Sequence, residues 1–218
     1  MAVRAAALCL LLAHQVSPAL AQAASPITLV VTEGDKEIGR EEFTLTSGRG
    51  RGASGTTLTA TAKYPATMPT TRLSALLERT PESAVAKFQL DVESSSGTSV
   101  ILAAGTGARL VVRTVAKGSE SGRELPGGPD VILLDEEVFS LYATVADLAT
   151  PAGKRLTAIY PRTGRRIAFT AQRDEVAGGD RRRVILTGDL VGTLVTDAEG
   201  RLHSLELPAQ NKVVTRAK

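Results

Sequence analysis

"RLTAIYPRTGRRIAFTAQ", residues 155–172, contains two short runs that alternate apolar and polar side chains and that meet at a turn. Apolar residues stand two positions apart in both runs: Leu156, Ala158 and Tyr160, then Ile167, Phe169 and Ala171. A period of two is that of a strand with one buried face. The turn between the runs contains Pro161 and Gly164, which is typical of a hairpin. The stretch therefore predicts two antiparallel strands with a common apolar face.

The same pattern recurs along the chain, for example in "TLTATAKY" (57–64) and "AVAKFQLDV" (84–92). Short turns with glycine separate such runs, and we expect about 10–12 strands joined mainly by hairpins. The fold class is thus mainly β, an antiparallel meander. Because strand twist accumulates, such a sheet curls into an open barrel or a β-roll. Two segments rich in Gly and Ser, 47–55 and 116–130, are predicted to be mobile loops.

"LLDEEVFSLYATVADLAT", residues 133–150, is the one stretch with helical periodicity. Asp135 stands where an N-cap belongs, and Pro151 follows the last apolar position. We therefore predict one helix near 135–149 that covers the sheet. The sequence leaves open whether this helix covers a cavity or a packed core.

The first residues, "MAVRAAALCLLLAHQVSPALAQA", have the composition of a secretory signal peptide. Arg4 precedes a short apolar run, and small residues precede a cleavage site expected after Ala23. We expect residues 1–23 to be the signal peptide and 24–218 to form a single β-rich domain of the periplasm or the secreted fraction. No later apolar run is long enough to predict a membrane span. The single cysteine, Cys9, lies within the predicted signal peptide, so no disulfide is expected.

Composition argues against several classes of function. The 26 Lys and Arg residues nearly balance 23 Asp and Glu residues, which gives no reason to expect nucleic acid. His203 is the only histidine after the predicted signal peptide, too few for a zinc site. The chain has seven aromatic residues and no Trp, which disfavours sites that stack sugars or single-stranded nucleic acid. No catalytic residue, cofactor or metal is predicted.

An aliphatic interior and an amphipathic helix favour a binding site for apolar molecules. We predict an exported, periplasmic, non-enzymatic protein that binds a lipid or another apolar ligand. The predicted ligand-binding residues come from the helix and from the hairpin at 155–172: Phe139, Leu141, Tyr142, Val145, Tyr160 and Phe169.

Two alternatives remain. One is an envelope interaction or accessory domain without a small-molecule ligand, which meets a partner protein through a sheet edge or through Arg-rich turns such as 181–183. The other is a hydrolase that uses the carboxylate of Asp135 or Glu137, although adjacent acids on a first helical turn do not by themselves form the opposed pair that glycosidases need.

"PDVILLDEEVFSLY", residues 129–142, resembles a segment of uncharacterised, β-rich exported bacterial proteins. In those proteins "LD", followed by Asn, an aromatic residue and a His-Tyr pair, opens a helix after several strands. Leu134, Asp135, Phe139 and Tyr142 fit this pattern, while Glu137 stands at the Asn place and Leu141 at the His place. The overall layout is also similar to that of the periplasmic lipoprotein carriers, and this resemblance implies an open barrel that holds acyl chains.

Overall fold

The computed structural model describes residues 25–47, 55–174 and 180–217. The predicted signal peptide and most of the 47–55 segment lie outside the described residues. In the described part, the first eight strands follow one another as an antiparallel meander: β1 (Ile27–Glu33), β2 (Lys36–Ser47), β3 (Thr56–Tyr64), β4 (Thr71–Arg79), β5 (Val85–Ser94), β6 (Gly97–Thr106), β7 (Arg109–Ala116) and β8 (Ser119–Pro126).

The chain then returns to the other side of β1 by a second meander. Its strands are β9 (Val131–Leu133), β10 (Lys154–Tyr160), β11 (Arg165–Asp174), β12 (Arg181–Gly188), β13 (Gly192–Asp197), β14 (Leu202–Leu207) and β15 (Lys212–Arg216). Because β15 pairs with β1, both meanders form one 15-stranded sheet that runs from β8 through β1 and β15 to β9. Named strands pair antiparallel except for β9 with β10. The predicted antiparallel meander is confirmed, with more strands than the 10–12 expected.

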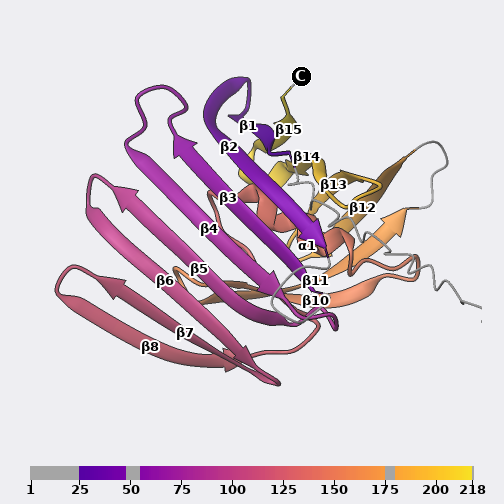
Figure 1. The fold of residues 1–218 in the computed structure, drawn as a ribbon. Helices are drawn as coiled ribbons and strands as arrows, with labels where there is room; N and C mark the ends of the chain where they lie inside the picture. Colours follow the sequence, from indigo (N-terminus) through magenta and orange to yellow (C-terminus); the bar gives the residue numbers. More distant parts are fainter. Residues whose placement is uncertain (1–24, 48–54, 175–179, 218) are drawn as a thin grey trace, which may run out of the picture.

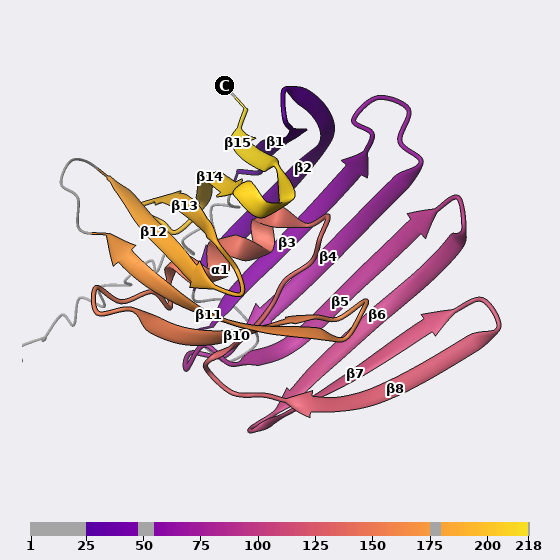
Figure 2. The same ribbon diagram turned by 180° about the vertical axis from the view of Figure 1, so that it is seen from behind.

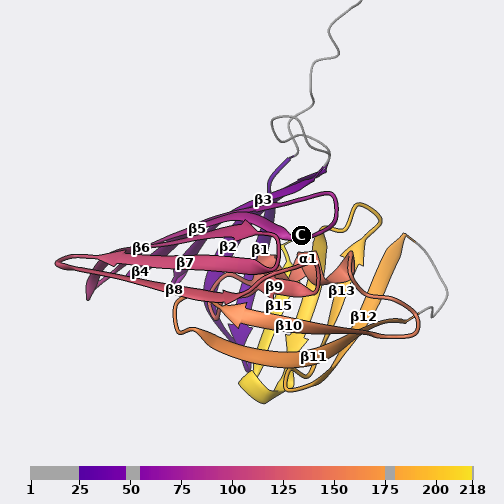
Figure 3. The same cartoon turned by 90° about the horizontal axis from the view of Figure 1, so that it is seen from below.

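The sheet curls until its second half faces its first half. Figure 1 shows β2 to β8 as a broad layer with β10 to β15 behind it, and Figure 2 shows the same layers from the other side. β9 lies beside β5, although no strand pairing in the described chain joins the edge strands β8 and β9. The result is a nearly closed barrel. Seen from below, β10 and β11 curve beneath the layer that holds β3 to β8 (Figure 3).

The predicted alternation of side chains is confirmed in the strands that face the interior. Leu58, Ala60, Ala62 and Tyr64 of β3 are buried, and the threonines between them are not. The buried apolar residues of both halves form one continuous cluster. Burial of this face fixes the register, because a shift by one residue would turn every apolar side chain outward.

The helical segment lies inside this cluster and is shorter than predicted. A 3-10 helix η1 (Phe139–Tyr142) continues into the single turn α1 (Ala143–Ala146). All eight residues are buried. The prediction of a helix over 135–149 with Asp135 as its N-cap is therefore wrong at both ends, because residues 135–138 and 147–149 are not helical. We call residues 139–146 the internal helix.

The prediction of a mobile loop over 116–130 is also wrong, because β8 occupies Ser119–Pro126 and pairs with β7 along its whole length. β8 is an edge strand whose side chains are exposed or half-buried. It therefore needs no apolar face and carries no alternating pattern. Glu120, Arg123, Glu124 and Pro126 on this edge are the residue types that hinder pairing with another chain.

Candidate functional site

A buried carboxylate holds the N-terminal end of the internal helix. Glu41 of β2 is fully buried and accepts hydrogen bonds from the backbone N–H groups of Phe139 at 2.8 Å and Ser140 at 3.0 Å. The first N–H groups of a helix have no partner within the helix, and a negative charge there also complements the helix dipole. Glu41, on a distant strand, therefore caps the first N–H groups of the helix, whereas the predicted N-cap Asp135 does not bind them.

The environment of Glu41 favours its neutral form. Burial raises the pKa of this carboxyl to about 7, although the Ser140 hydroxyl and the two N–H groups oppose that rise and the Asp135 charge adds to it. Tyr64 of β3 lies near these acids, and burial together with the Glu41 charge raises its pKa. Its phenol oxygen is buried and has no hydrogen-bond partner in the described chain. The helix thus begins next to two buried polar groups, the Glu41 carboxyl and the Tyr64 hydroxyl, inside an otherwise apolar interior.

The Tyr64 ring packs against Gly39, two residues before Glu41 on the inward face of β2. A Cβ at Gly39 would come within 2.2 Å of the ring. We expect Gly39→Ala to lower the free energy of unfolding by about 1–3 kcal/mol, because the ring must move into a packed core. Urea unfolding measures this change.

Gly122→Ala in β8 is the matched control, since a Cβ there meets nothing closer than 4.0 Å. Its expected effect is within about 0.5 kcal/mol. Equal effects of both substitutions would contradict the close contact between Tyr64 and Gly39.

One arginine binds the other end of the internal helix, and a second binds the segment that follows it. Arg79 of β4 is buried and donates from Nη1 to the carbonyl of Thr144 at 3.2 Å and from Nε to the carbonyl of Ser83 at 2.8 Å. Arg173 of β11 donates to the carbonyl of Ala149 at 2.7 Å. Burial lowers the pKa of Arg79 to about 10, so the group remains cationic at neutral pH. Positive charge here complements the carbonyl end of the helix dipole.

A polar pocket opens beside the N-terminal end of the helix. Its volume is about 360 Å³, and three separate segments line it: Asp135, Glu136, Glu137, Tyr160, Arg162, Thr163 and Lys212. This volume lies at the lower end of the range found for small-molecule sites. We call it the 135–212 pocket.

Arg162 organises one wall of this pocket. Its Nε and Nη2 atoms donate to the two carboxylate oxygens of Asp135 at 2.7 and 2.6 Å, and Nη1 donates to Glu137 at 3.0 Å. Asp135 is 2 % exposed, and it also accepts the N–H of Glu137 at 2.9 Å. A bidentate pair of this kind is strong and directional. The two acids that a hydrolase would use thus share one arginine on the same wall of the pocket.

Aromatic rings connect this pocket to the core. The Tyr160 hydroxyl lies 3.5 Å from that of Tyr142, and Tyr142 stacks on Phe139 with ring centroids 6.4 Å apart. Arg165 lies over the Tyr160 ring at 4.2 Å, and the Lys212 ammonium lies 5.4 Å from the centre of the Phe139 ring. The polar pocket therefore has aromatic side chains beneath its charged groups.

The structure brings the predicted ligand-binding residues together in the core. These side chains are at most 2 % exposed: Phe139, Leu141, Tyr142, Val145, Tyr160 and Phe169. Tyr160 also lines the 135–212 pocket, and Phe169 borders a separate hollow near Asp189. The other four residues line neither of these two spaces, and they pack within the apolar cluster.

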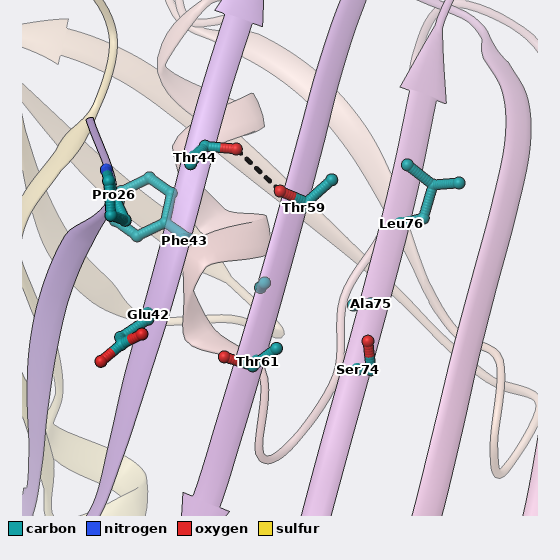
Figure 4. A pocket seen from close by; sticks show the side chains of 10 residues that line it. Pro26, Glu42, Phe43, Thr44, Thr59, Thr61, Ser74, Ala75 and Leu76 are labelled. Carbon is teal, nitrogen blue, oxygen red and sulfur yellow. Dashed lines mark hydrogen bonds between the residues drawn. The ribbon is translucent and has the colours of Figure 1, made fainter. Parts of the chain in front are cut away.

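A second hollow, of about 340 Å³, lies on the outer face of β2 to β4 (Figure 4). Threonine and serine side chains stand along it, and the hydroxyls of Thr44 and Thr59 lie 2.7 Å apart across the strands. Cross-strand threonine pairs are common on the solvent face of antiparallel sheets. No charged side chain other than Glu42 lines this hollow, so it has fewer groups for recognition than the 135–212 pocket.

Within the described ranges, no group of three or more His, Cys, Asp and Glu residues is arranged to hold a metal ion. No helix there has the length and apolar character that crossing a membrane requires. His203 is half-buried on β14 and does not line the 135–212 pocket.

No sequence motif marks Glu41 or Arg79, but each is a charged residue at an inward position of a strand. Glu41 lies in phase with the buried Phe43 and Leu45, and Arg79 lies in phase with the buried Ala75 and Leu77. A charged residue at an inward position of a strand must find partners inside, because an unpaired buried charge is very costly. A search for charges that break the apolar phase would have found both residues.

No protein-family model matches the sequence, and no curated protein matches it either. Among solved structures, a DUF1089 family protein from Pseudomonas aeruginosa is a weak structural neighbour. The alignment covers 90 % of this chain and 97 % of that chain, with 12 % sequence identity and a TM-score of 0.43.

Proposed function

We propose that this protein is an exported, non-enzymatic binding protein of the periplasm whose ligand is a lipid or a similar amphipathic molecule. The observation that carries the proposal is the 135–212 pocket, where charged groups from three segments surround Tyr160, whose hydroxyl lies beside that of Tyr142 in the core. Small-molecule sites commonly combine an apolar surface with a few well-placed polar groups. The polar part of the ligand occupies this pocket.

The apolar part of the ligand enters between the internal helix and the sheet. The described interior is filled by one apolar cluster, so an acyl chain has to replace side-chain contacts that the helix makes now. Phe139, Tyr142 and Tyr160 are the first of these contacts below the pocket. The helix is held at its ends by a few charged groups, and its movement exposes a continuous apolar surface to the ligand.

Two features make this role more favourable than the alternatives. The carboxylates of Asp135 and Glu137 are both bound to Arg162, which leaves no opposed pair of acids for hydrolysis. The exposed edge of β8 carries charged residues and Pro126, which disfavour an interaction by strand addition.

Native mass spectrometry of the full-length gene product, purified from a periplasmic extract, tests the proposal. We expect a chain that begins at Ala24, after cleavage of the predicted signal peptide, and that carries one bound molecule of lipid size. Extraction with organic solvent then releases the molecule for identification. A protein that carries no extra mass, and that takes up no short-chain phospholipid when one is added, would contradict the binding role.

A further inference from the structure

The 135–212 pocket contains one carboxylate with unused capacity. Asp135 is fully engaged, because both oxygens accept bonds from Arg162 and one also accepts an N–H group. Glu137 is different: its Oε2 accepts one bond from Arg162, no bond to its Oε1 occurs in the described chain, and the side chain is 33 % exposed. Two acids share one arginine on this wall, which leaves one negative charge in excess at Glu137.

The same pocket contains one cation with unused capacity. Lys212 opens β15, where backbone pairing with Glu33 and Leu207 fixes its position. Its ammonium group donates to the backbone carbonyl of Glu136 at 3.3 Å, and it forms no ion pair with the described residues. An ammonium group has three donors, so two N–H groups of Lys212, which lines the pocket, have no hydrogen-bond partner in the described chain.

The remaining charges of the pocket compensate each other. Glu136 pairs with Arg165 at 3.3 Å, and Arg165 in turn lies over the Tyr160 ring. The pocket therefore presents a second carboxylate oxygen of Glu137 that can accept a hydrogen bond, and ammonium N–H groups of Lys212 that can donate. A purely anionic head group would be attracted by Lys212 but repelled by Glu137. A purely cationic head group would be attracted by Glu137 but repelled by Lys212.

We infer that the ligand of the proposed function has a zwitterionic head group, in which a phosphate contacts Lys212 and a primary ammonium contacts Glu137. This inference rests on the proposed binding role and adds the chemical class of the ligand. A primary ammonium donates hydrogen bonds to a carboxylate, which a quaternary ammonium does not do. An aminoalkyl phosphate such as phosphoethanolamine has both groups, and a single pocket of about 360 Å³ accommodates a head group of this size.

Calorimetric titration of the mature chain with three dihexanoyl phospholipids, each below its micellar concentration, tests the inference. The probes are phosphatidylethanolamine, phosphatidylcholine and phosphatidylglycerol. We expect phosphatidylethanolamine to bind about tenfold more tightly than phosphatidylglycerol, since one charge-assisted hydrogen bond contributes that much. Phosphatidylcholine should lie between the two.

Two substitutions separate the two contacts. Lys212→Gln should weaken both phosphatidylethanolamine and phosphatidylglycerol about tenfold, whereas Glu137→Gln should abolish the preference between them. Lys87→Gln and Glu206→Gln, at exposed positions on other strands, are the matched controls and should leave every affinity unchanged.

The possible outcomes distinguish this inference from the proposed function. Equal affinities for all three phospholipids, unchanged in the Lys212 and Glu137 variants, would overturn the zwitterionic ligand and leave a binding protein of lower selectivity. No binding of any phospholipid, together with a protein free of bound lipid after purification, would overturn both.

Discussion

Arg162→Ala is expected to lower the free energy of unfolding by about 3 kcal/mol, because it leaves the Asp135 carboxylate without its cation. Asp135 is 2 % exposed, so water cannot replace the lost guanidinium. The expected loss of unfolding free energy lies at the lower end of the range for buried ion pairs, because the Arg162 side chain is 26 % exposed. Chemical denaturation of the purified variant, followed by circular dichroism, measures the change.

The double variant Arg162→Ala with Asp135→Asn separates the loss of this pair from the loss of packing. Because the amide carries no charge, the double variant should be more stable than the sum of the two single effects predicts, by about 1 kcal/mol or more. Arg165→Ala is the comparison within the same turn, since its ion pair with Glu136 is half exposed and should contribute less than about 1 kcal/mol. Additive effects of Arg162→Ala and Asp135→Asn would contradict a buried, coupled pair.

Stability is expected to fall as pH rises through the range in which Glu41 loses its proton. Burial raises the pKa of Glu41 to about 7 in the folded protein, from 4.5 for an exposed glutamate. The folded state therefore binds more protons than the unfolded state between these two values. The contribution of Glu41 to stability is fully present below pH 4.5 and is lost by about pH 7. Its size is on the order of 3 kcal/mol.

Glu41→Gln isolates this contribution, because glutamine keeps an acceptor for the helix N–H groups and does not titrate. The unfolding free energy of wild type minus that of the variant should decrease by about 3 kcal/mol from pH 4 to pH 8. The variant therefore gains relative to wild type as the pH rises. Glu42→Gln is the matched control, since Glu42 is the next residue in β2 and is exposed. Parallel stability curves for wild type and Glu41→Gln would show that burial does not govern the titration of Glu41.

The internal helix has eight residues, and isolated helices of this length are not stable in water. It persists because the barrel buries its side chains, because Glu41 and Arg79 bind its two ends, and because Arg173 binds the segment that follows it. In the described chain no backbone hydrogen bond joins residues 139–146 to a strand, which suits the movement that ligand entry requires in the proposed function.

The sequence was sufficient to predict the strands of the barrel wall. The period of two in β3, β5, β10 and β11 reflects one buried face, and turns with glycine fix antiparallel neighbours. Strands without such a face were harder to recognise. β8 has no fully buried side chain, and β9 (Val131–Leu133) is buried at every position, so neither shows a clear alternation.

The 135–212 pocket was predictable only in part. The sequence predicts Tyr160 as a residue that binds an apolar ligand, whereas the side chains around it in this pocket are charged or polar. Its neighbours in the pocket, Arg162 and Lys212, come from a turn and from the last strand. Fifty residues separate these two in the sequence, and no local pattern relates positions that meet through the pairing of distant strands.

The sequence by itself determined that this chain forms an antiparallel meander with one helical segment, because side-chain periodicity and turn residues act over short distances. Only the tertiary structure decided that the helix lies inside the barrel and where it starts. Asp135 carries the local signal of an N-cap, yet its carboxylate binds Arg162 and the N–H of Glu137, which lies before the helix. The N-terminal end of the helix is set by Glu41, almost one hundred residues earlier, because a buried carboxyl group and unpaired N–H groups can satisfy each other only after the sheet has closed around them.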